Sequence, residues 1–400
     1  MDESPLFRRS DSVEGDVRPF EELRLRIEEP DWSGWTEGEF EERALAAFRH
    51  QYETCAPYRA LCTRRGVAPD TIVSWEDAPA VPATAFKYFD FVSVHEGDAA
   101  DPASAGLFLT IGTTQGRESR GQHHVPSLDL YRASLAEPFR RALLPTVEPA
   151  EAPTASFLSL IPSPDATPRS SLSFMVGAAA ERFARRVVWL VDGDGRWRPE
   201  GVAVLEDEVA AAEEREAPLL VLGTALSFVH LRDALESRDR PSRDDPTIAG
   251  QLARGMAGLP GWARAMETGG FKGSHRSVTR DDLHAGIEAT TGITRDRIVN
   301  EYGMTELLSQ SYDGPEGLHR PPPWLKVRAL DPDDLTPMPE GKEGILAFFD
   351  LANLGSVCHV LTEDVGSIHD GGLRLQGRAA GAEPRGCSRA LDDLMTAARG

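Results

Sequence analysis

An α/β fold is predicted for this chain because short apolar runs alternate with helical patterns through its middle part. A strand-like, turn-rich stretch follows after about residue 325. Such alternation is typical of parallel strands that are covered by helices. The expected strands lie at 156–161, 187–191, 219–222 and 297–300, and later at 345–349, 357–361 and 373–375. The expected helices lie at 128–144, 171–183, 202–215, 224–235 and 279–290.

The N-terminal part reads as a surface segment followed by a clear helix. Residues 1–30 are polar and charge-mixed, so we expect them to be loosely ordered or wrapped on the surface. Thr36 and Glu39 have capping-box spacing, and apolar residues recur every four positions from Phe40 to Tyr52. The tryptophans nearby are expected to pack against this helix and the segment after it: Trp32, Trp35 and Trp75.

Composition excludes several classes of protein. The formal charge of -21 argues against sequence-independent nucleic-acid binding, because the phosphate backbone would repel it. The N-terminus lacks the apolar core of a signal peptide, and no apolar run is long enough to span a membrane. The 4 cysteines show no CxxC spacing and form no disulfide framework. We therefore expect a cytoplasmic protein with reduced thiols.

The segment from Thr110 to Arg120 concentrates glycines, hydroxyls and arginines between two extended runs. Glycines let backbone N–H groups approach an anion, and arginines supply forked cationic donors, here Arg117 and Arg120. No Gly-Lys-Thr/Ser ends the loop and residues 123–126 look extended, so the loop differs from the P-loop and is expected to be the tip of a hairpin that closes over phosphates. A polar hairpin turn without such a ligand is the alternative. Of His123 and His124, which follow, one could approach a phosphate, and a histidine on a strand surface is the alternative.

The stretch from Asn300 to Glu306 follows a predicted strand and combines an aromatic ring, a glycine, a hydroxyl and a carboxylate. Such a set could stack a base, bind phosphate and hold a divalent cation. The alternative is a strand–turn–helix junction in which Thr305 is the N-cap.

Two C-terminal stretches also carry candidate chemistry. Asp364 lies in what reads as a turn after an apolar strand, where a carboxylate can bind ribose hydroxyls or simply form an Asx turn. Cys387 lies among arginines and glycines, and positive neighbours favour the thiolate that nucleophilic chemistry needs. A lone cysteine is usually inert, so the sequence leaves both roles open.

The order of these stretches resembles the adenylate-forming superfamily, and more closely its acyl-protein synthetase branch, with phenylacetate–CoA ligases as cousins. The motifs are Gly-Thr-Thr-Gln-Gly-x-x-x-Arg, then Asn-Glu-Tyr-Gly-Met-Thr-Glu about 190 residues later, and Gly-Arg-x-x-Gly-Ala-Glu-x-Arg-Gly-Cys-Ser. The resemblance covers about residues 75–395. It implies the large α/β domain of these enzymes, with mixed sheets flanked by helices and the C-terminal lid domain missing or vestigial.

The resemblance also implies roles for individual residues. Glu306 would hold Mg²⁺, Thr305 would contact the α-phosphate, and Cys387 would receive the acyl group. The ATP site would comprise Thr110, Gly112, Thr113, Thr114, Gly116, Gly269, Gly270, Tyr302, Gly303, Asp364 and Arg378. The acyl site would include Thr224 and Phe228.

The implied activity is ATP-dependent activation of a fatty or aryl acid, followed by acyl transfer to a thiol. That thiol would belong to Cys387 or to a partner protein. The expected partner is an acyl-acceptor protein or a reductase. Ile111 replaces the superfamily's serine. With the lid domain expected to be missing or vestigial, we expect Arg117, Arg120, Lys272 or a partner protein to replace its catalytic lysine. A CoA ligase and a nucleotide-binding scaffold that has lost catalysis are the alternatives.

The domain organisation expected from these patterns has three parts. Residues 1–75 would pack on the core as a helical and extended segment, and residues 76–376 would form the α/β core. Residues 377–400 would be a truncated C-terminal tail that carries Cys387.

Overall fold

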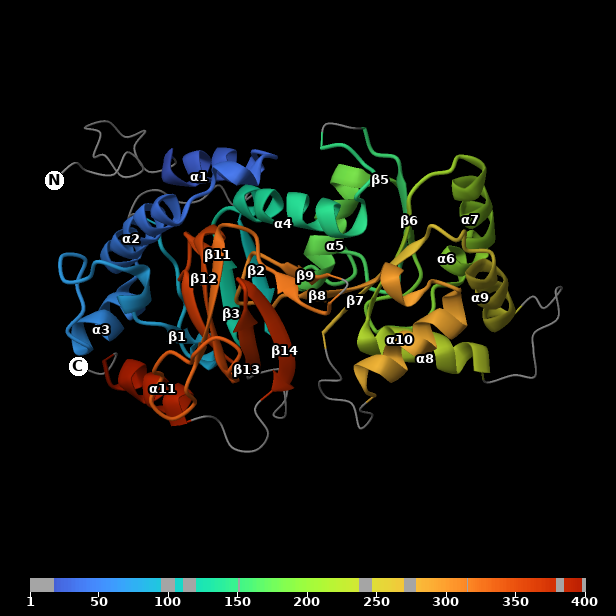
Figure 1. The fold of residues 1–400 in the computed structure, drawn as a ribbon. Helices are drawn as coiled ribbons and strands as arrows, with labels where there is room; N and C mark the ends of the chain where they lie inside the picture. Colours follow the sequence, from blue (N-terminus) through green and yellow to red (C-terminus); the bar gives the residue numbers. More distant parts are fainter. Residues whose placement is uncertain are drawn as a thin grey trace. The chain divides into compact units, whose positions relative to one another are not determined.

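The computed structural model describes residues 18–94, 105–110, 120–149, 152–236, 247–269, 278–314, 316–378 and 385–397. The chain divides into two compact units. Unit 1 comprises residues 1–137, 304–311 and 316–400, and unit 2 comprises residues 138–303 and 312–315. Each unit contains its own group of neighbouring strands, which is called the sheet of that unit below (Figure 1).

The sheet of unit 1 is mainly antiparallel. Its strands run in the order β11-β12-β13-β14-β10, and the short β1 pairs with β13 in the parallel sense. A separate antiparallel hairpin is formed by β2 and β3. The strands are β1 (Val81–Pro82), β2 (Gly106–Leu109), β3 (Gln122–Val125), β10 (His319–Arg320), β11 (Leu325–Leu330), β12 (Gly344–Asp350), β13 (His359–His369) and β14 (Gly372–Arg378). The strand β9 (Ser311–Asp313) has residues in both units.

The helices of unit 1 come from both ends of the chain. They are α1 (Arg18–Glu28), α2 (Glu37–Thr54), α3 (Ala56–Arg64) and α11 (Arg385–Ala397). The predicted capping box is present, because the Thr36 hydroxyl accepts a hydrogen bond from the Glu39 N–H. Figure 1 shows α11 beside α3 and β1, so the C-terminal helix packs on the N-terminal part of the chain.

Aromatic side chains join the N-terminal helices of unit 1 to its sheet. Trp32 and Trp35 pack on the fully buried Trp324, and Trp75 packs on Phe40 and Phe349 with ring centroids 5.8 and 5.4 Å away. The predicted packing role of these tryptophans is therefore confirmed.

The sheet of unit 2 is parallel, as the strand–helix alternation predicted. Its strands run in the order β5-β4-β6-β7-β8. They are β4 (Ala155–Ser159), β5 (Ala184–Trp189), β6 (Leu219–Thr224), β7 (Arg264–Thr268) and β8 (Ile298–Tyr302). The strand β6 lies beside β4 although β5 comes between them in the chain. The chain therefore passes from β4 to β5 on one side of β4 and then crosses back to β6 on the other side.

Helices cover both faces of this parallel sheet. One face carries a core to which α7, α8, α9 and α10 contribute, with Leu158, Val221 and Ala265 from the strands. On the other face, Phe139 near the end of α4 packs on Phe157 and stacks on Phe183 of α5. The helices are α4 (Leu128–Leu143), α5 (Ser171–Phe183), α6 (Pro199–Ala203), α7 (Leu205–Glu214), α8 (Ala225–Glu236), α9 (Ile248–Ala257) and α10 (Arg280–Thr291).

Two local details differ from the expectations. The N-terminal segment, expected to be loosely ordered or wrapped on the surface, contains the regular helix α1, whose Leu23 and Ile27 are four residues apart and both buried. The helix expected over 202–215 instead comprises α6 and α7, which meet at Val204. Pro199 starts α6 earlier than expected, because proline is well tolerated in the first turn of a helix.

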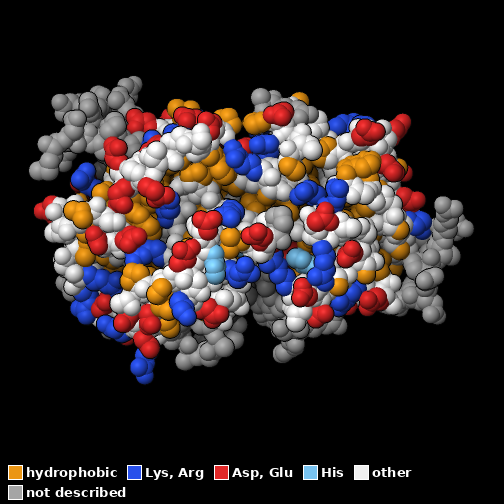
Figure 2. Space-filling view, viewed as in Figure 1, with side chains coloured by type: hydrophobic (Ala, Val, Ile, Leu, Met, Phe, Trp, Pro, Cys, Tyr) orange, Lys and Arg blue, Asp and Glu red, His pale blue; other side chains and the backbone are white. Residues whose placement is uncertain are grey.

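The charge of the protein is distributed over its surface. Figure 2 shows acidic and basic side chains interspersed over the face drawn there, with no single acidic patch. An acidic chain can therefore still present local cations to an anionic ligand. Within the ranges that the structure describes, no helix is both long and apolar enough to cross a membrane.

Candidate active site

The carboxyl ends of the parallel strands in unit 2 form one edge, and several predicted site residues lie there. Thr224 ends β6, Tyr302 ends β8, and Gly303 follows it. Gly269 follows β7 with φ of 70°, a left-handed conformation that favours glycine. Parallel α/β sheets bind ligands at this edge, where neighbouring connections diverge, as they do between β4 and β6. Gly270 and Lys272 lie outside the described residues.

The turn that holds Thr224 is closed by reciprocal hydrogen bonds at the start of α8. The Thr224 hydroxyl accepts from the Ser227 N–H at 3.0 Å, and the Ser227 hydroxyl accepts from the Thr224 N–H at 2.8 Å. Phe228 is only 3% exposed within the core of unit 2. A Cβ at Gly223 would come within 2.8 Å of the Phe228 ring, so glycine is required there. Contact between Phe228 and a bound acid stays a prediction.

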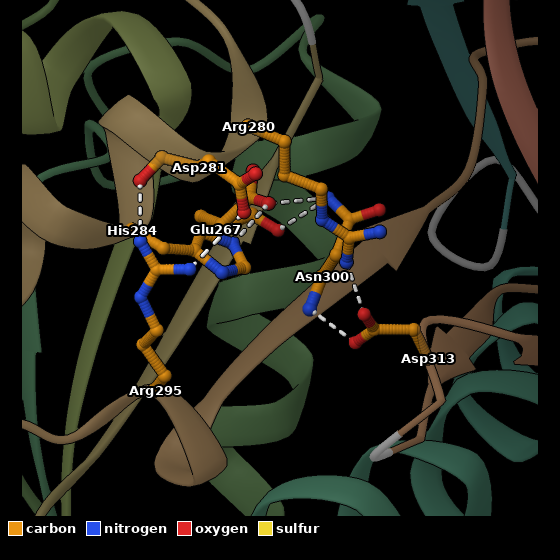
Figure 3. Close-up of polar contacts among 7 residues, drawn as sticks. All are labelled: Glu267, Arg280, Asp281, His284, Arg295, Asn300 and Asp313. Carbon is orange, nitrogen blue, oxygen red and sulfur yellow. Dashed lines mark hydrogen bonds and ion pairs between the residues drawn. The ribbon is translucent and has the colours of Figure 1, made fainter.

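A polar cluster that the sequence did not reveal anchors the end of β8. Asp313 accepts from the Asn300 N–H at 2.6 Å and pairs with Arg280 (Figure 3). The Asn300 amide donates to Glu267 at 2.8 Å, and His284 of α10 lies 3.2 Å from the same carboxylate. The members come from β7, α10, β8 and β9, so no local sequence pattern unites them. This cluster fixes the strand end that carries Tyr302.

Glu301 faces the other side of the same sheet and is almost completely buried. Its carboxylate accepts a hydrogen bond from the Thr268 hydroxyl. Burial raises the pKa of Glu301 to about 7, which the Thr268 hydrogen bond opposes and the nearby Glu267 charge reinforces. Near neutral pH this carboxyl therefore holds its proton in a substantial fraction of the folded molecules.

The raised pKa of Glu301 makes stability fall as pH rises. The folded protein keeps a proton on Glu301 that the unfolded chain releases near pH 4.5. The free energy of unfolding therefore falls as pH rises from about 4.5 through about 7. We expect the stability of Glu301→Gln relative to the unsubstituted protein to grow by about 2 kcal/mol between about pH 5.5 and pH 8. Urea unfolding at the two pH values measures this.

The control for Glu301→Gln is Glu213→Gln, which changes an exposed glutamate of α7 in the same unit. A surface substitution of this kind changes stability by at most about 0.5 kcal/mol, so it measures the effect of a Glu→Gln change by itself. A stability difference for Glu301→Gln that stays the same at both pH values would contradict the raised pKa of Glu301.

The predicted hairpin around the glycine-rich loop is confirmed in unit 1. Beyond the ladder of β2 and β3, the Thr110 N–H donates to the Gly121 carbonyl at 2.9 Å. The Thr110 hydroxyl accepts from the Gly121 N–H at 2.8 Å, so this side chain helps to close the base of the hairpin. Arg120 is exposed beside it. The other loop candidates lie outside the described residues: Gly112, Thr113, Thr114, Gly116 and Arg117.

Thr305 and Glu306 lie in a turn of unit 1, where Thr305 is half-buried and Glu306 is 8% exposed. No helix starts at Thr305 in the described chain, so the N-cap alternative is wrong. His123 is fully buried rather than on a strand surface, and its Nδ1 lies 2.5 Å from the Thr305 carbonyl oxygen. The structure thus brings the base of the hairpin and this turn together.

Asp364 lies within β13 and not in a turn, which corrects the sequence interpretation. It is the register partner of Arg378 on β14, and Arg378 Nε donates to its Oδ1 at 3.2 Å. The pairing explains the error, because β13 continues through a bulge between Val365 and Gly366. Asp364 and Arg378, predicted as joint ribose ligands, are therefore adjacent.

Cys387 is buried in unit 1, contrary to the cationic surroundings that its sequence neighbours suggested. It is 2% exposed, and its Sγ donates to the Thr362 carbonyl at 3.4 Å. Apolar residues surround it, because α11 turns this side chain toward the sheet: Leu330, Ile345, Ala347, Leu361 and Ala390. An acyl donor could reach the thiol only after α11 moves away from this cluster.

The donor considered for Mg²⁺ is a single carboxylate, that of Glu306, which would need the phosphates of a bound nucleotide as further ligands. In the part of the chain that the structure describes, no group of three or more histidine, cysteine, aspartate and glutamate side chains could hold a metal ion. Mg²⁺ is commonly held by one or two carboxylates together with substrate phosphates. Glu306 could provide such a single carboxylate.

The fold is that of the adenylate-forming enzymes. An open-conformation structure of 2-hydroxyisobutyryl-CoA ligase in complex with 2-HIB-AMP and CoA aligns with a TM-score of 0.59 at 13% identity. The alignment covers 86% of this chain and 69% of that chain. The structural class predicted from the sequence is therefore confirmed.

Sequence comparisons point to a particular family within this class. Residues 259–396 match the family described as acyl-protein synthetase, LuxE. The long-chain-fatty-acid–luciferin-component ligase of Vibrio harveyi is 29% identical over 106 residues, which are 26% of this chain and 28% of the relative. The same-named ligase of Aliivibrio fischeri is 26% identical over 104 residues, with 26% and 28% covered. The predicted resemblance to acyl-protein synthetases is confirmed.

The matches span only part of these relatives. The chain aligns with 28% of the length of each curated ligase. The matched region 259–396 nevertheless contains Tyr302, Thr305, Glu306, Asp364 and Cys387.

Proposed function

We propose that this protein uses ATP to activate a carboxylic acid as an acyl-adenylate and then passes the acyl group to a thiol. The observation that carries the proposal is that a LuxE acyl-protein synthetase match covers the Tyr302–Glu306 motif, Asp364 and Cys387 on an adenylate-forming fold. The curated relatives are named as ligases of long-chain fatty acids, so we propose a fatty acid as the substrate class.

Activation is needed because a carboxylate is a poor electrophile. A carboxylate oxygen attacks the α-phosphorus of ATP in line, the bond from that phosphorus to the bridging oxygen breaks, and pyrophosphate leaves. The product is a mixed anhydride from which AMP departs readily. Most of the catalysis in such a step is positioning and charge stabilisation.

The family resemblance supplies a role for each residue that would bind the nucleotide. Tyr302 at the end of β8 would pack on the adenine, and the Thr305 hydroxyl would donate to the α-phosphate. Asp364 would accept from the ribose hydroxyls while Arg378 orients it, as the 3.2 Å contact between them supports. Glu306 would hold Mg²⁺, which when bound neutralises negative charge on the phosphates. Arg117, Arg120 or Lys272 would supply further positive charge.

Transfer requires a thiolate to attack the acyl carbonyl, with AMP as the leaving group and the thiol proton released to solvent or base. Cys387 is the thiol that the family resemblance supplies. Its burial means that α11 must first release it, and a thiol of a partner protein is the other acceptor.

An ATP–pyrophosphate exchange screen over aliphatic and aromatic acids tests the proposal. We expect exchange to depend on the acid, and intact mass to show an acylated protein that hydroxylamine returns to its original mass. Exchange that yields free acyl-CoA on addition of CoA, without acylated protein, would favour a CoA ligase. ATP binding without any acid-dependent exchange would exclude carboxylate activation and favour a nucleotide-binding scaffold.

A further inference from the structure

The turn that carries Thr305 and Glu306 has little regular secondary structure of its own. Between β8 and β9, the Leu307 N–H donates to the Met304 carbonyl, and the other backbone contacts of residues 305–309 described below go to side chains. The conformation of such a turn depends on those side chains, because buried backbone groups must be paired.

Three side chains hold carbonyl groups of this turn. His123 Nδ1 from β3 lies 2.5 Å from the Thr305 oxygen, and Asn353 Nδ2 donates to the Glu306 oxygen at 2.7 Å. The Ser134 hydroxyl on α4 donates to the Leu308 oxygen at 2.7 Å. All three side chains are completely buried in unit 1.

A buried carboxylate holds the N–H groups on the other side of the turn. Asp350 at the end of β12 accepts from the Leu308 and Ser309 N–H groups, both at 2.9 Å, and from the Ser309 hydroxyl at 2.7 Å. It also accepts from the Ala352 N–H at 3.0 Å, which starts the 3₁₀ turn that contains Asn353. One residue therefore fixes both the turn and the segment that supplies Asn353.

The hydrogen-bond directions define the protonation of His123. A carbonyl oxygen only accepts, so Nδ1 must carry the proton, and burial lowers the pKa of His123 to about 4. The imidazole is therefore neutral, with its proton on Nδ1 and its lone pair on Nε2. Its contact with the turn is thus a fixed donor.

We propose that His123, Asp350 and Asn353 are positioning residues, which hold the Thr305 hydroxyl and the Glu306 carboxylate in the geometry needed for adenylation. This inference rests on the proposed function. The three residues would touch neither nucleotide nor acid, and they would act through the backbone of the turn. Small displacements of catalytic groups lower rates strongly, so kcat should be affected more than the KM for ATP.

The structure offers a matched control for His123. His359 is also a buried histidine of unit 1, with its Nδ1 2.7 Å from the Ala78 carbonyl and its pKa lowered by burial to about 4. Its Nε2 lies without a hydrogen-bond partner among the described residues. The carbonyl that it holds lies far along the chain from Thr305. His123→Ala and His359→Ala should therefore lower Tm similarly and differ only in catalysis.

The experiment measures acid-dependent ATP–pyrophosphate exchange with hexadecanoate, below the Tm of every variant. We expect His123→Ala to lower kcat about 10- to 100-fold, with a smaller change in KM for ATP. His359→Ala should stay within about twofold of the unsubstituted protein. His123→Asn should recover most of the rate, because its amide N–H can occupy the place of Nδ1–H.

Two results of these kinetic measurements would contradict a positioning role for His123. Unchanged kcat in His123→Ala, or an equal loss in His359→Ala, would overturn it. Should His123→Ala fail to fold, His123→Asn is compared with His123→Gln, whose donor lies one methylene farther out, and equal kcat values would overturn the inference. Absence of exchange in the unsubstituted protein would overturn the proposed function and this inference together, and that result needs no variant.

Discussion

Glu306→Gln is expected to lower acid-dependent pyrophosphate exchange about 100-fold or more while the protein stays folded. The substitution keeps the size of the side chain, and the Asn353 side-chain amide can still donate to the main-chain carbonyl of residue 306. It removes the negative charge that would bind Mg²⁺ beside the phosphates, and the metal stabilises charge that spreads over those phosphates during in-line attack. The kcat of exchange, measured at saturating Mg²⁺ and ATP, tests this expectation.

The control is Glu343→Gln, which removes an exposed carboxylate of unit 1 just before β12. It should leave exchange within about twofold, because isolated surface charges contribute little. Circular dichroism and Tm confirm that both variants are folded. If Glu306→Gln kept full exchange at low Mg²⁺, Glu306 would not be the metal ligand, and the role taken from the resemblance would be wrong.

Cys387→Ser is expected to abolish the hydroxylamine-labile acyl-protein and to leave pyrophosphate exchange within about twofold. Adenylation precedes acyl transfer and uses no thiol, whereas a serine hydroxyl is a much weaker nucleophile near neutral pH. Intact mass after incubation with ATP and a fatty acid gives the first result, and the exchange assay gives the second.

Cys62→Ser provides the matched thiol control. Cys62 is also buried on a helix, α3, and burial raises its pKa to about 12, so it should not be acylated. Acylated protein should therefore persist in Cys62→Ser. An acyl group that survives on Cys387→Ser would exclude Cys387 as the acceptor.

The burial of Cys387 adds a test of how α11 is held. Asp393 of α11 contacts Arg64 and Arg65 of the α3 end at 3.2 and 3.3 Å, and these pairs are partly exposed. Each exposed pair contributes at most about 1 kcal/mol, so the loss of both changes an opening equilibrium by up to about 30-fold. Asp393→Ala should accordingly raise the rate of Cys387 labelling by a thiol reagent by no more than that factor.

The features that could be predicted from sequence depend on patterns within single elements and on the order in which elements follow one another. The capping box at Thr36, the full extent of α5 and the hairpin before and after the glycine-rich loop follow from periodicity and turn chemistry. The parallel sheet of unit 2 followed from the alternation of strands and helices, since parallel strands need crossover connections. The order of the motifs then identified the structural class.

Features that depend on distant parts of the chain were missed or misread. Asp364 reads as a turn residue from its neighbours, yet it lies in β13 because β14 pairs with it. The neighbours of Cys387 in the sequence suggest a thiol in cationic surroundings, yet α11 directs its side chain toward the apolar cluster of unit 1. The cluster around Glu267 and Asp313 combines residues from four segments, so no spacing in the sequence indicates it.

The sequence by itself determined the α/β class, the parallel sheet and the identity of the candidate nucleotide and acyl-transfer residues, because these follow from short-range periodicity and motif order. Only the tertiary structure decided how those residues are supported and which of them are accessible. Thr305 and Glu306 are held by His123, Asn353 and Asp350 because β3, β12 and the segment after it fold against one turn. Burial and buried hydrogen bonds arise between segments that are far apart in the chain, and local sequence patterns do not predict such partners.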